Sequence, residues 1–130
     1  MNYWVFKVFE SQRGVDVIGE WLNILPLEAK VQIKRRFAYL ATLKKEDWRR
    51  PLAAKLKGKK YDSIWEIIIK WNKIQYRPLG CFGPEEDNFT LLIWAIERST
   101  GIFEPRNAPE TAKARCNLIH KDRRFLGEYS

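Results

Sequence analysis

A basic stretch in the middle of the chain carries the side chains best suited to binding a phosphate. Residues 44–77 hold eleven basic and four acidic groups, in a chain whose net charge is +8. Such a concentrated positive field attracts polyphosphates, and nucleic acid would bind it with a salt-dependent affinity. The stretch could instead be a solvated loop or the surface that meets an acidic protein. The side chains expected to contact a nucleic-acid backbone are Arg49, Arg50, Lys55, Lys57, Lys59 and Lys60.

Three further residues offer acid–base chemistry. The two-residue period of a strand places Lys70 on the same face as Glu66 and Ile68, where it could act as a base or simply be solvated. His120 is the only histidine and could exchange a proton near neutral pH, although a histidine near a helix end is usually ordinary surface. Tyr129 could supply a phenol from a C-terminal tail that we expect to be frayed.

Length and composition predict one globular domain of 130 residues. Hydrophobic residues make up 45% of the chain, and six Trp, five Tyr and seven Phe predict an aromatic core. No run approaches the roughly eighteen apolar residues of a membrane span, so we expect a soluble, cytoplasmic protein. Cys81 and Cys116 lack the density of a secreted scaffold and the spacing of a zinc site, so both are expected to be reduced thiols in or near the core.

The first third of the chain predicts a strand followed by two helices. Over Tyr3–Phe9 a two-residue period places apolar residues on both sides, interrupted only by Lys7, which is typical of a strand with two partly covered faces. Apolar residues recur at helical spacing over Asp16–Asn23, which predicts a short helix. Pro26 suits the first turn of a second helix, and an apolar stripe continues it from Leu27 to about Leu43. The basic connector Lys44–Lys60 follows.

The remainder predicts three strands and a last helix. The strands are expected over Ser63–Trp71, Lys73–Phe82 and Phe89–Ile96, which are rich in β-branched and aromatic residues. A tight turn at Asn72 and an acidic loop at Gly83–Asn88 would join them. Within the second run, the proline at position 78 requires a bulge or an edge position.

After the third strand, Ser99–Arg106 is expected to be a loop. The segment Asn107–Glu110 then has capping-box spacing, which predicts the last helix. We therefore expect an α+β domain in which a twisted antiparallel sheet of about four strands carries the helices on one face.

Five short motifs in this order resemble a known family. They are Leu56-Lys57-Gly58, Ile64-Trp65-Glu66-Ile67, Tyr76-Arg77, Glu97-Arg98 and Pro109-Glu110. Together with the order of elements, they resemble the RelE/HigB toxin superfamily, in particular its phage-derived HigB-like branch. The likeness covers roughly residues 1–120, and it implies a single RelE-like domain over residues 1–130.

The resemblance also implies a function. Members of the family are toxins of type II toxin–antitoxin pairs, and they act as mRNA interferases that cut the message in the ribosomal A site. They use no metal or other cofactor. The resemblance therefore implies three partners for this chain, namely a cognate antitoxin that covers the basic face, mRNA and the ribosome.

The resemblance implies a catalytic role for Arg77, whose guanidinium could contact the reacting phosphate. The alternative is a salt bridge from Arg77 to Glu66 across the hairpin. Arg98 falls near the family's second catalytic arginine, and the alternative is an exposed charge at the end of a strand. Lys70 could replace a missing family cation as the base.

Several positions depart from the family pattern. Ile68 and Glu66 stand where the family often has an arginine and a lysine, and Glu97 replaces one of two lysines. Phe103 stands where the family has a phenol, and it has no hydroxyl. These departures favour a second hypothesis, a catalytically inactive RNA- or protein-binding module from a phage or mobile element. A DNA-binding regulator is weaker, because no helix-turn-helix pattern with a basic second helix is present.

Overall fold

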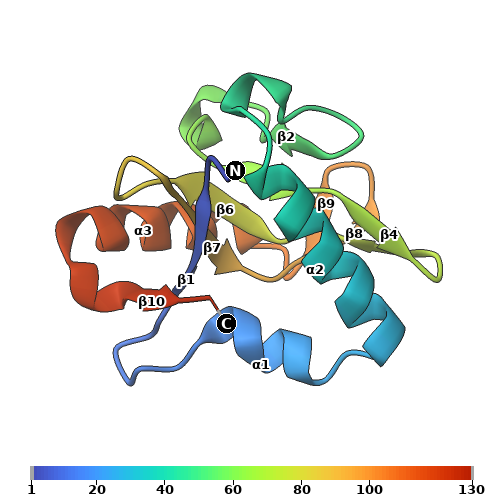
Figure 1. Ribbon diagram of the computed structural model, residues 1–130, viewed down its shortest axis with the longest axis horizontal. Coiled ribbons are helices and arrows are strands. Elements are labelled where there is room, and N and C mark those ends of the chain that lie inside the picture. The colour runs from blue at the N-terminus through green and yellow to red at the C-terminus, as the bar shows by residue number, and fades with distance from the viewer. Residues whose placement is uncertain (1, 130) are drawn as a thin grey trace.

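The computed structural model describes residues 2–129, which form three α-helices and ten β-strands (Figure 1). The helices are α1 (Val17–Asn23), α2 (Leu27–Ala41) and α3 (Ala108–Lys121). The strands are β1 (Val5–Phe9), β2 (Ala53–Lys55), β3 (Trp65–Ile67), β4 (Ile69–Trp71), β5 (Ile74–Tyr76), β6 (Leu79–Phe82), β7 (Asn88–Ile93), β8 (Ile96–Ser99), β9 (Ile102–Glu104) and β10 (Leu126–Glu128). Single 3₁₀ turns lie at Lys45–Asp47, Lys59–Tyr61 and Arg123–Phe125.

The strands form two sheets. The six-stranded sheet has the order β10-β1-β7-β6-β3-β2, and the four-stranded sheet has the order β4-β5-β8-β9. All strand pairs are antiparallel except β1 and β7, which run parallel. The larger sheet is therefore mixed, and the smaller one is antiparallel.

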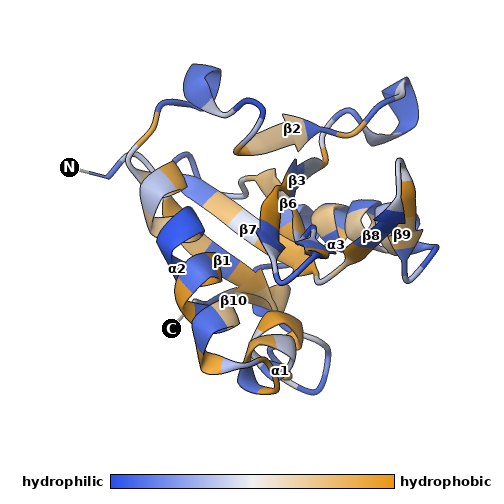
Figure 2. Ribbon diagram, turned by 90° about the vertical axis from the view of Figure 1, so that its right-hand side faces the viewer, coloured by the Kyte–Doolittle hydropathy of each residue, from blue (hydrophilic) through white to orange (hydrophobic). Residues whose placement is uncertain are grey.

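The six-stranded sheet lies between two helical layers. Figure 2 shows α1 and α2 on one side of β1 and β7, with α3 on the other. Side chains alternate along β7, so Phe89 and Leu91 pack with α2 while Leu92 packs with α3. Our expectation of helices on one face was wrong, because β7 is apolar on both faces and so requires cover on both.

An aromatic cluster anchors the basic connector to the first of these cores. Trp48 lies in the connector, yet its ring centroid is 4.7 Å from that of Phe89 and 4.8 Å from that of Phe82. Its indole Nε1 donates a hydrogen bond to the Leu40 carbonyl at 3.0 Å. The predicted aromatic core is confirmed, and through Trp48 it fixes the start of the segment that carries the basic side chains.

The prediction of one antiparallel, RelE-like sheet of about four strands was wrong, although the chain is α+β with three helices. Each of the three long predicted strands is broken into two, and the halves belong to different sheets. The breaks fall at Ile68, at Arg77 and Pro78, and at Trp94 and Ala95. Pro78 offers no backbone donor, so the strand bends at this position. The strands that are hydrogen-bonded to it on either side bend at the same level. The Arg77 amide still donates to the Ala95 carbonyl at 2.8 Å, across the bend.

Three more strands arise where the sequence predicted irregular chain. β2 lies in the basic connector, β9 in the expected loop and β10 in the tail that we expected to be frayed. Each spans three residues, which is too short for a two-residue period to be recognised. β10 pairs with β1 and forms one edge of the large sheet. Ser130 lies outside the described residues.

Other local predictions are confirmed. The short helix expected over Asp16–Asn23 is α1. The Asp16 side chain accepts hydrogen bonds from the amides of Ile18 and Gly19, and so caps this helix. Asn72 and Lys73 have φ of 51° and 64° between β4 and β5, as a two-residue type I′ hairpin turn requires. None of the helices formed by residues 2–129 is long and apolar enough to span a bilayer.

The order of the C-terminal tail can be tested with Tyr129→Ala. The Tyr129 ring lies 5.8 Å from that of Phe37 and 6.3 Å from that of Phe6. Its removal should lower the free energy of unfolding by about 1–3 kcal/mol in a denaturant titration, because buried aromatic contacts are lost. Glu128→Ala, at an exposed neighbour, is the control and should have little effect. Equal stability of Tyr129→Ala and wild type would mean that the tail is frayed after all.

Candidate functional cleft

Arg77 lies at the junction of the two sheets. It follows β5 directly, at the bend that leads into β6, and its side chain is 7% exposed. Its Nε lies 3.3 Å from Glu66 Oε1, and its Nη2 lies 3.4 Å from Glu97 Oε1. Nη1 donates to the Tyr76 carbonyl at 2.9 Å, and Nη2 donates to Gln75 Oε1 at 2.8 Å. The guanidinium is therefore engaged by protein acceptors.

The two carboxylates that pair with Arg77 come from different sheets. Glu66 belongs to β3 of the six-stranded sheet, and Glu97 belongs to β8 of the four-stranded sheet. The alternative that we gave for Arg77, a salt bridge to Glu66, is therefore present. A direct contact between Arg77 and a phosphate would require these ion pairs to open.

Glu66 is a buried carboxylate with an altered affinity for its proton. Burial raises the pKa of Glu66 above its usual value, and the nearby charge of Glu97 raises it further. Arg77 and Arg50 act in the opposite direction without cancelling the effect. A carboxylate that holds its proton more tightly than usual is suited to accept and return a proton closer to neutral pH.

Glu66 also lines a surface cleft of about 250 Å³. The walls come from β2 and the turn after it, from β3, from the β8–β9 hairpin and from the start of α3, which lie near one another in Figure 2. The residues around it are Arg50, Lys55, Leu56, Lys57, Tyr61, Glu66, Glu97, Thr100, Gly101, Phe103 and Pro109.

The cleft brings together half of the six basic residues expected to bind nucleic acid. Arg50, Lys55 and Lys57 line it, and all three are exposed. Arg49, Lys59 and Lys60 are also exposed but do not line it. These three cations outnumber the two carboxylates of the lining, Glu66 and Glu97, so the cleft can attract an anion while keeping a proton acceptor inside it.

A phenol that we did not predict lies in the same cleft. Tyr61 ends the 3₁₀ turn Lys59–Tyr61, and its hydroxyl donates to Glu110 Oε1 at 2.6 Å. This hydrogen bond raises the pKa of Tyr61 and lowers that of Glu110. Phe103, which lacks the hydroxyl expected by analogy, also lines the cleft. The sequence signal for Tyr61 was only its position directly after the lysine pair.

Arg98 and Lys70 lie outside the cleft lining. Arg98 is exposed on β8 and forms an ion pair with Glu104 of β9, in agreement with the alternative of an exposed strand-end charge. Lys70 is exposed on β4, in a different sheet from Glu66. The two-residue period that placed Lys70 beside Glu66 does not hold, because the strand breaks at Ile68.

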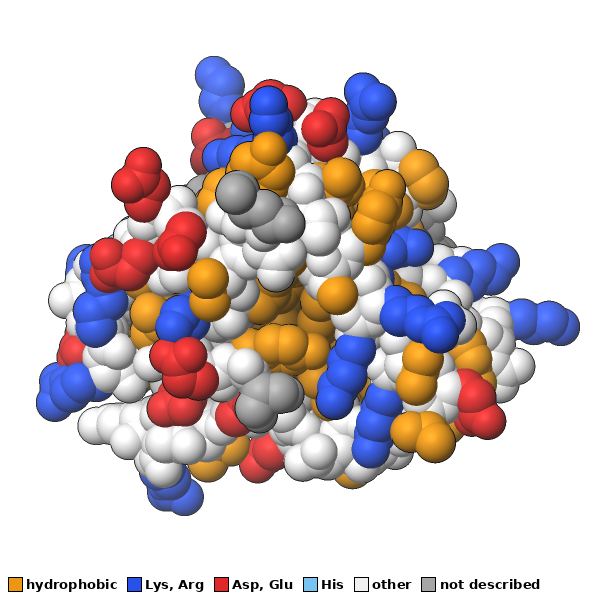
Figure 3. All heavy atoms as spheres, in the orientation of Figure 1, with side chains coloured by type: hydrophobic (Ala, Val, Ile, Leu, Met, Phe, Trp, Pro, Cys, Tyr) orange, Lys and Arg blue, Asp and Glu red, His pale blue; other side chains and the backbone are white. Residues whose placement is uncertain are grey.

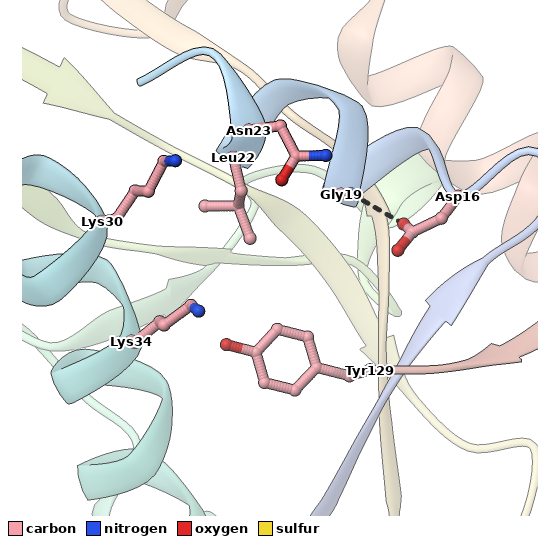
Figure 4. A pocket seen from close by; sticks show the side chains of 7 residues that line it. All are labelled: Asp16, Gly19, Leu22, Asn23, Lys30, Lys34 and Tyr129. Atoms are coloured by element: carbon pink, nitrogen blue, oxygen red, sulfur yellow. Dashed lines mark hydrogen bonds between the residues drawn. The ribbon is translucent and has the colours of Figure 1, made fainter. Parts of the chain in front are cut away.

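Tyr129 lies in a second hollow of about 190 Å³, between α1, α2 and the C-terminal tail. Figure 4 shows its hydroxyl facing Lys34, with Lys30 on the next turn of α2. The only carboxylate in its lining, Asp16, already caps α1. An adjoining hollow is lined largely by apolar side chains, as the centre of Figure 3 shows. Neither hollow contains a buried carboxylate beside a cation, so the cleft at Glu66 is the better candidate.

Within residues 2–129, one group of side chains has its metal-ligating atoms close together: Cys81, Cys116 and His120. None of the three lines the cleft. Both cysteines are free and buried, as expected from the sequence.

Comparisons with family models, with curated proteins and with solved structures found no match to this chain. The resemblance to the RelE/HigB superfamily therefore stays a prediction, and the functional argument depends on the cleft itself.

The ion pairs at the sheet junction can be tested with Arg77→Met. This change leaves Glu66 and Glu97 without their shared cation, so it should lower the free energy of unfolding by about 3–5 kcal/mol at pH 7. Adding Glu66→Gln to the same protein removes one of the uncompensated carboxylates and should restore part of the loss. Urea titrations of the single and double variants measure both effects. A single variant as stable as wild type would contradict the assignment.

The same site predicts a pH dependence of stability. Because the pKa of Glu66 is raised on folding, the folded chain binds this proton more tightly than the unfolded chain. The contribution of the Glu66 proton to the free energy of unfolding is therefore fully present below the ordinary pKa of 4.5. It is lost as pH rises through the pKa of the folded state. Glu66→Gln should lack this decrease, so its stability relative to wild type should rise from pH 4 to pH 7. A difference that does not change with pH would contradict the raised pKa.

Proposed function

We propose that this protein is an endoribonuclease that cleaves mRNA and so inhibits translation, as the toxin of a type II toxin–antitoxin pair. One observation carries the proposal: a buried carboxylate with a raised pKa, Glu66, lies in a cleft whose lining includes Arg50, Lys55 and Lys57. A proton acceptor next to exposed cations is what cleavage of RNA by its own 2′-hydroxyl requires.

In the proposed reaction Glu66 acts as the general base. Its carboxylate takes the proton from a ribose 2′-hydroxyl, and the oxygen attacks the adjacent phosphorus. The bond from phosphorus to the 5′-oxygen of the next nucleotide then breaks. The products are a 2′,3′-cyclic phosphate and a free 5′-hydroxyl. Arg77 is a positioning residue in this account, because it holds the Glu66 carboxylate and leaves the phosphate to the cations of the cleft.

The cations supply the charge that the transition state needs. Attack of the 2′-oxygen increases negative charge on the non-bridging oxygens of the phosphate, and Arg50, Lys55 and Lys57 are placed to neutralise it. Tyr61 is the candidate general acid, since its phenol lies in the cleft and carries its proton near neutral pH, as phenols ordinarily do. Cleavage by these groups should persist in the presence of a chelator.

The partners follow from the same charges. The basic connector that borders the cleft suits the backbone of mRNA and of ribosomal RNA, through contacts that do not depend on sequence. An antitoxin with an acidic segment would use the same field and would block the cleft when bound. Translating ribosomes would place the site of action in the cytoplasm.

A second candidate is an RNA- or protein-binding module without catalysis. It is favoured by the ion pairs of the two arginines for which the resemblance implied a catalytic role. Arg77 is paired with Glu66 and Glu97, and Arg98 is paired with Glu104. Under this hypothesis the cleft binds RNA or protein, and the raised pKa of Glu66 reflects only its burial.

Inducible expression in a bacterial host separates the two candidates. Wild type should arrest growth and create new mRNA 5′ ends inside translated frames. Glu66→Gln should reduce cleavage about 10²- to 10⁴-fold at equal protein level, which is the usual range for loss of a general base. Glu86→Gln makes the same chemical change at an exposed residue outside the cleft, and it should behave as wild type.

Growth arrest without new ends would favour the binding module. Harmless expression of wild type would contradict both candidates as inhibitors of translation.

The role of the exposed cations is tested by Lys55→Gln/Lys57→Gln. With single-stranded RNA, the double variant should bind more weakly, and its dependence of log K on log salt should be shallower by about 1.4, since two phosphate contacts are lost. Lys73→Gln/Lys121→Gln removes the same charge from exposed lysines outside both the cleft and the basic connector, and it should change binding less. Equal effects of the two double variants would mean that only net charge matters, and that the cleft has no particular role.

A further inference from the structure

A second reactive cluster lies between β6 and α3, and the proposed cleavage of RNA does not use it. Cys81 lies on β6, and Cys116 lies on α3. Figure 1 shows α3 alongside the six-stranded sheet at this point. The two Sγ atoms are 2.7 Å apart, although the residues are 35 positions apart in the sequence.

The packing of both elements forces this contact. Along β6, Leu79 and Cys81 point towards α3, as the alternation of a strand requires. Cys116 lies on the buried stripe of α3 with Ala112 and Ile119. The Cys81 residue is 1% exposed and the Cys116 residue 6%, so Cys116 is the more accessible of the two.

His120 completes the cluster one helical turn after Cys116. Its Nδ1 lies 2.8 Å from the Cys116 carbonyl oxygen and 3.8 Å from Cys116 Sγ. The opposite edge of the ring is held against Gly83, where a Cβ atom would lie only 2.6 Å from His120 Nε2. The ring is therefore fixed beside the sulfur, and a side chain at position 83 would displace it.

The two thiols are not equivalent. The hydrogen bond between the two thiols, assisted by His120, lowers the pKa of Cys116 to about 7 despite its burial. The same hydrogen bond, together with burial, raises the pKa of Cys81. Cys116 is thus suited to react first as a thiolate, and Cys81 is suited to follow as the resolving thiol.

We propose that Cys116 is a peroxide-reactive cysteine and that its oxidation yields an intramolecular disulfide with Cys81. The Cys116 thiolate attacks one oxygen of hydrogen peroxide, the O–O bond breaks, and the departing hydroxide takes a proton to become water. Cys116 is then a sulfenic acid. The Cys81 sulfur attacks the Cys116 sulfur and forms the S–S bond as the S–O bond breaks. The Cys81 proton leaves with that hydroxide as a second water molecule.

A disulfide fits this geometry better than a metal ion. Two thiolates on one tetrahedral zinc, each about 2.3 Å from the metal, lie roughly 3.8 Å apart. The two sulfurs are already more than 1 Å closer than that. Within residues 2–129 the cluster also offers only three ligating atoms, one fewer than a closed structural zinc site has.

The reduced full-length protein, treated with stoichiometric hydrogen peroxide, provides the test. Its intact mass should fall by about 2 Da, since two hydrogens are lost, and dithiothreitol should reverse the change. A non-reducing peptide map should show a disulfide between the peptides that contain Cys81 and Cys116.

Variants separate the roles of the two thiols. In Cys81→Ala the reaction should stop at a sulfenic acid on Cys116 that dimedone traps, whereas Cys116→Ala should leave Cys81 unmodified. His120→Gln should slow the oxidation at least about threefold, because it removes the imidazole beside the Cys116 sulfur.

Three results would overturn this inference. They are no loss of mass, disulfides that form only between molecules, and a Cys81 that peroxide oxidises in the Cys116→Ala variant. Retention of one zinc per reduced chain, with protection of both thiols from peroxide, would assign the cluster to a metal instead. All these measurements follow sulfur chemistry, so they are independent of whether the protein cleaves RNA.

Discussion

The structure depends on one buried cation shared by two carboxylates at the junction of two sheets. Arg77 follows the end of one short strand, and its guanidinium contacts Glu66 in the six-stranded sheet and Glu97 in the four-stranded sheet. Burial of Glu66 and the nearby charge of Glu97 raise the pKa of Glu66 above its usual value, and Arg77 opposes this effect without cancelling it. The residue that pairs with Arg77 in the six-stranded sheet is thus the same carboxylate that we propose as the general base of the cleft.

This arrangement changes which basic residues are free to contact a phosphate. The resemblance implied that Arg77 would contact the phosphate, whereas in the structure Arg77 organises a carboxylate and the exposed residues Arg50, Lys55 and Lys57 are left to meet an anion. The burial of the acceptor and the exposure of the cations follow from β3 lying inside the sheet and β2 at its edge. In the proposed reaction, binding and proton transfer therefore belong to different residues of one cleft.

The sequence predicted the elements whose signals are local. The short helix over Asp16–Asn23, the helix from Leu27 and the turn at Asn72 each depend on a few neighbouring residues, and all three are confirmed. The bends at Ile68 and Ala95 were missed, since each depends on a hydrogen-bonded neighbour bending at Pro78. For the same reason the cleft was predicted only in part: its lysines form a local cluster, but the meeting of Glu66, Glu97 and Tyr61 is set by tertiary packing.

The central claim is that Glu66 titrates unusually and faces the substrate, and carbon-detected NMR of its side-chain carboxyl tests both parts in one experiment. The Glu66 resonance should titrate above the usual range for glutamate. It should also shift when an RNA dinucleotide with a 2′-O-methyl group is added, because the modified ribose occupies the cleft without being cleaved. An ordinary titration, together with no response to the dinucleotide, would contradict the account.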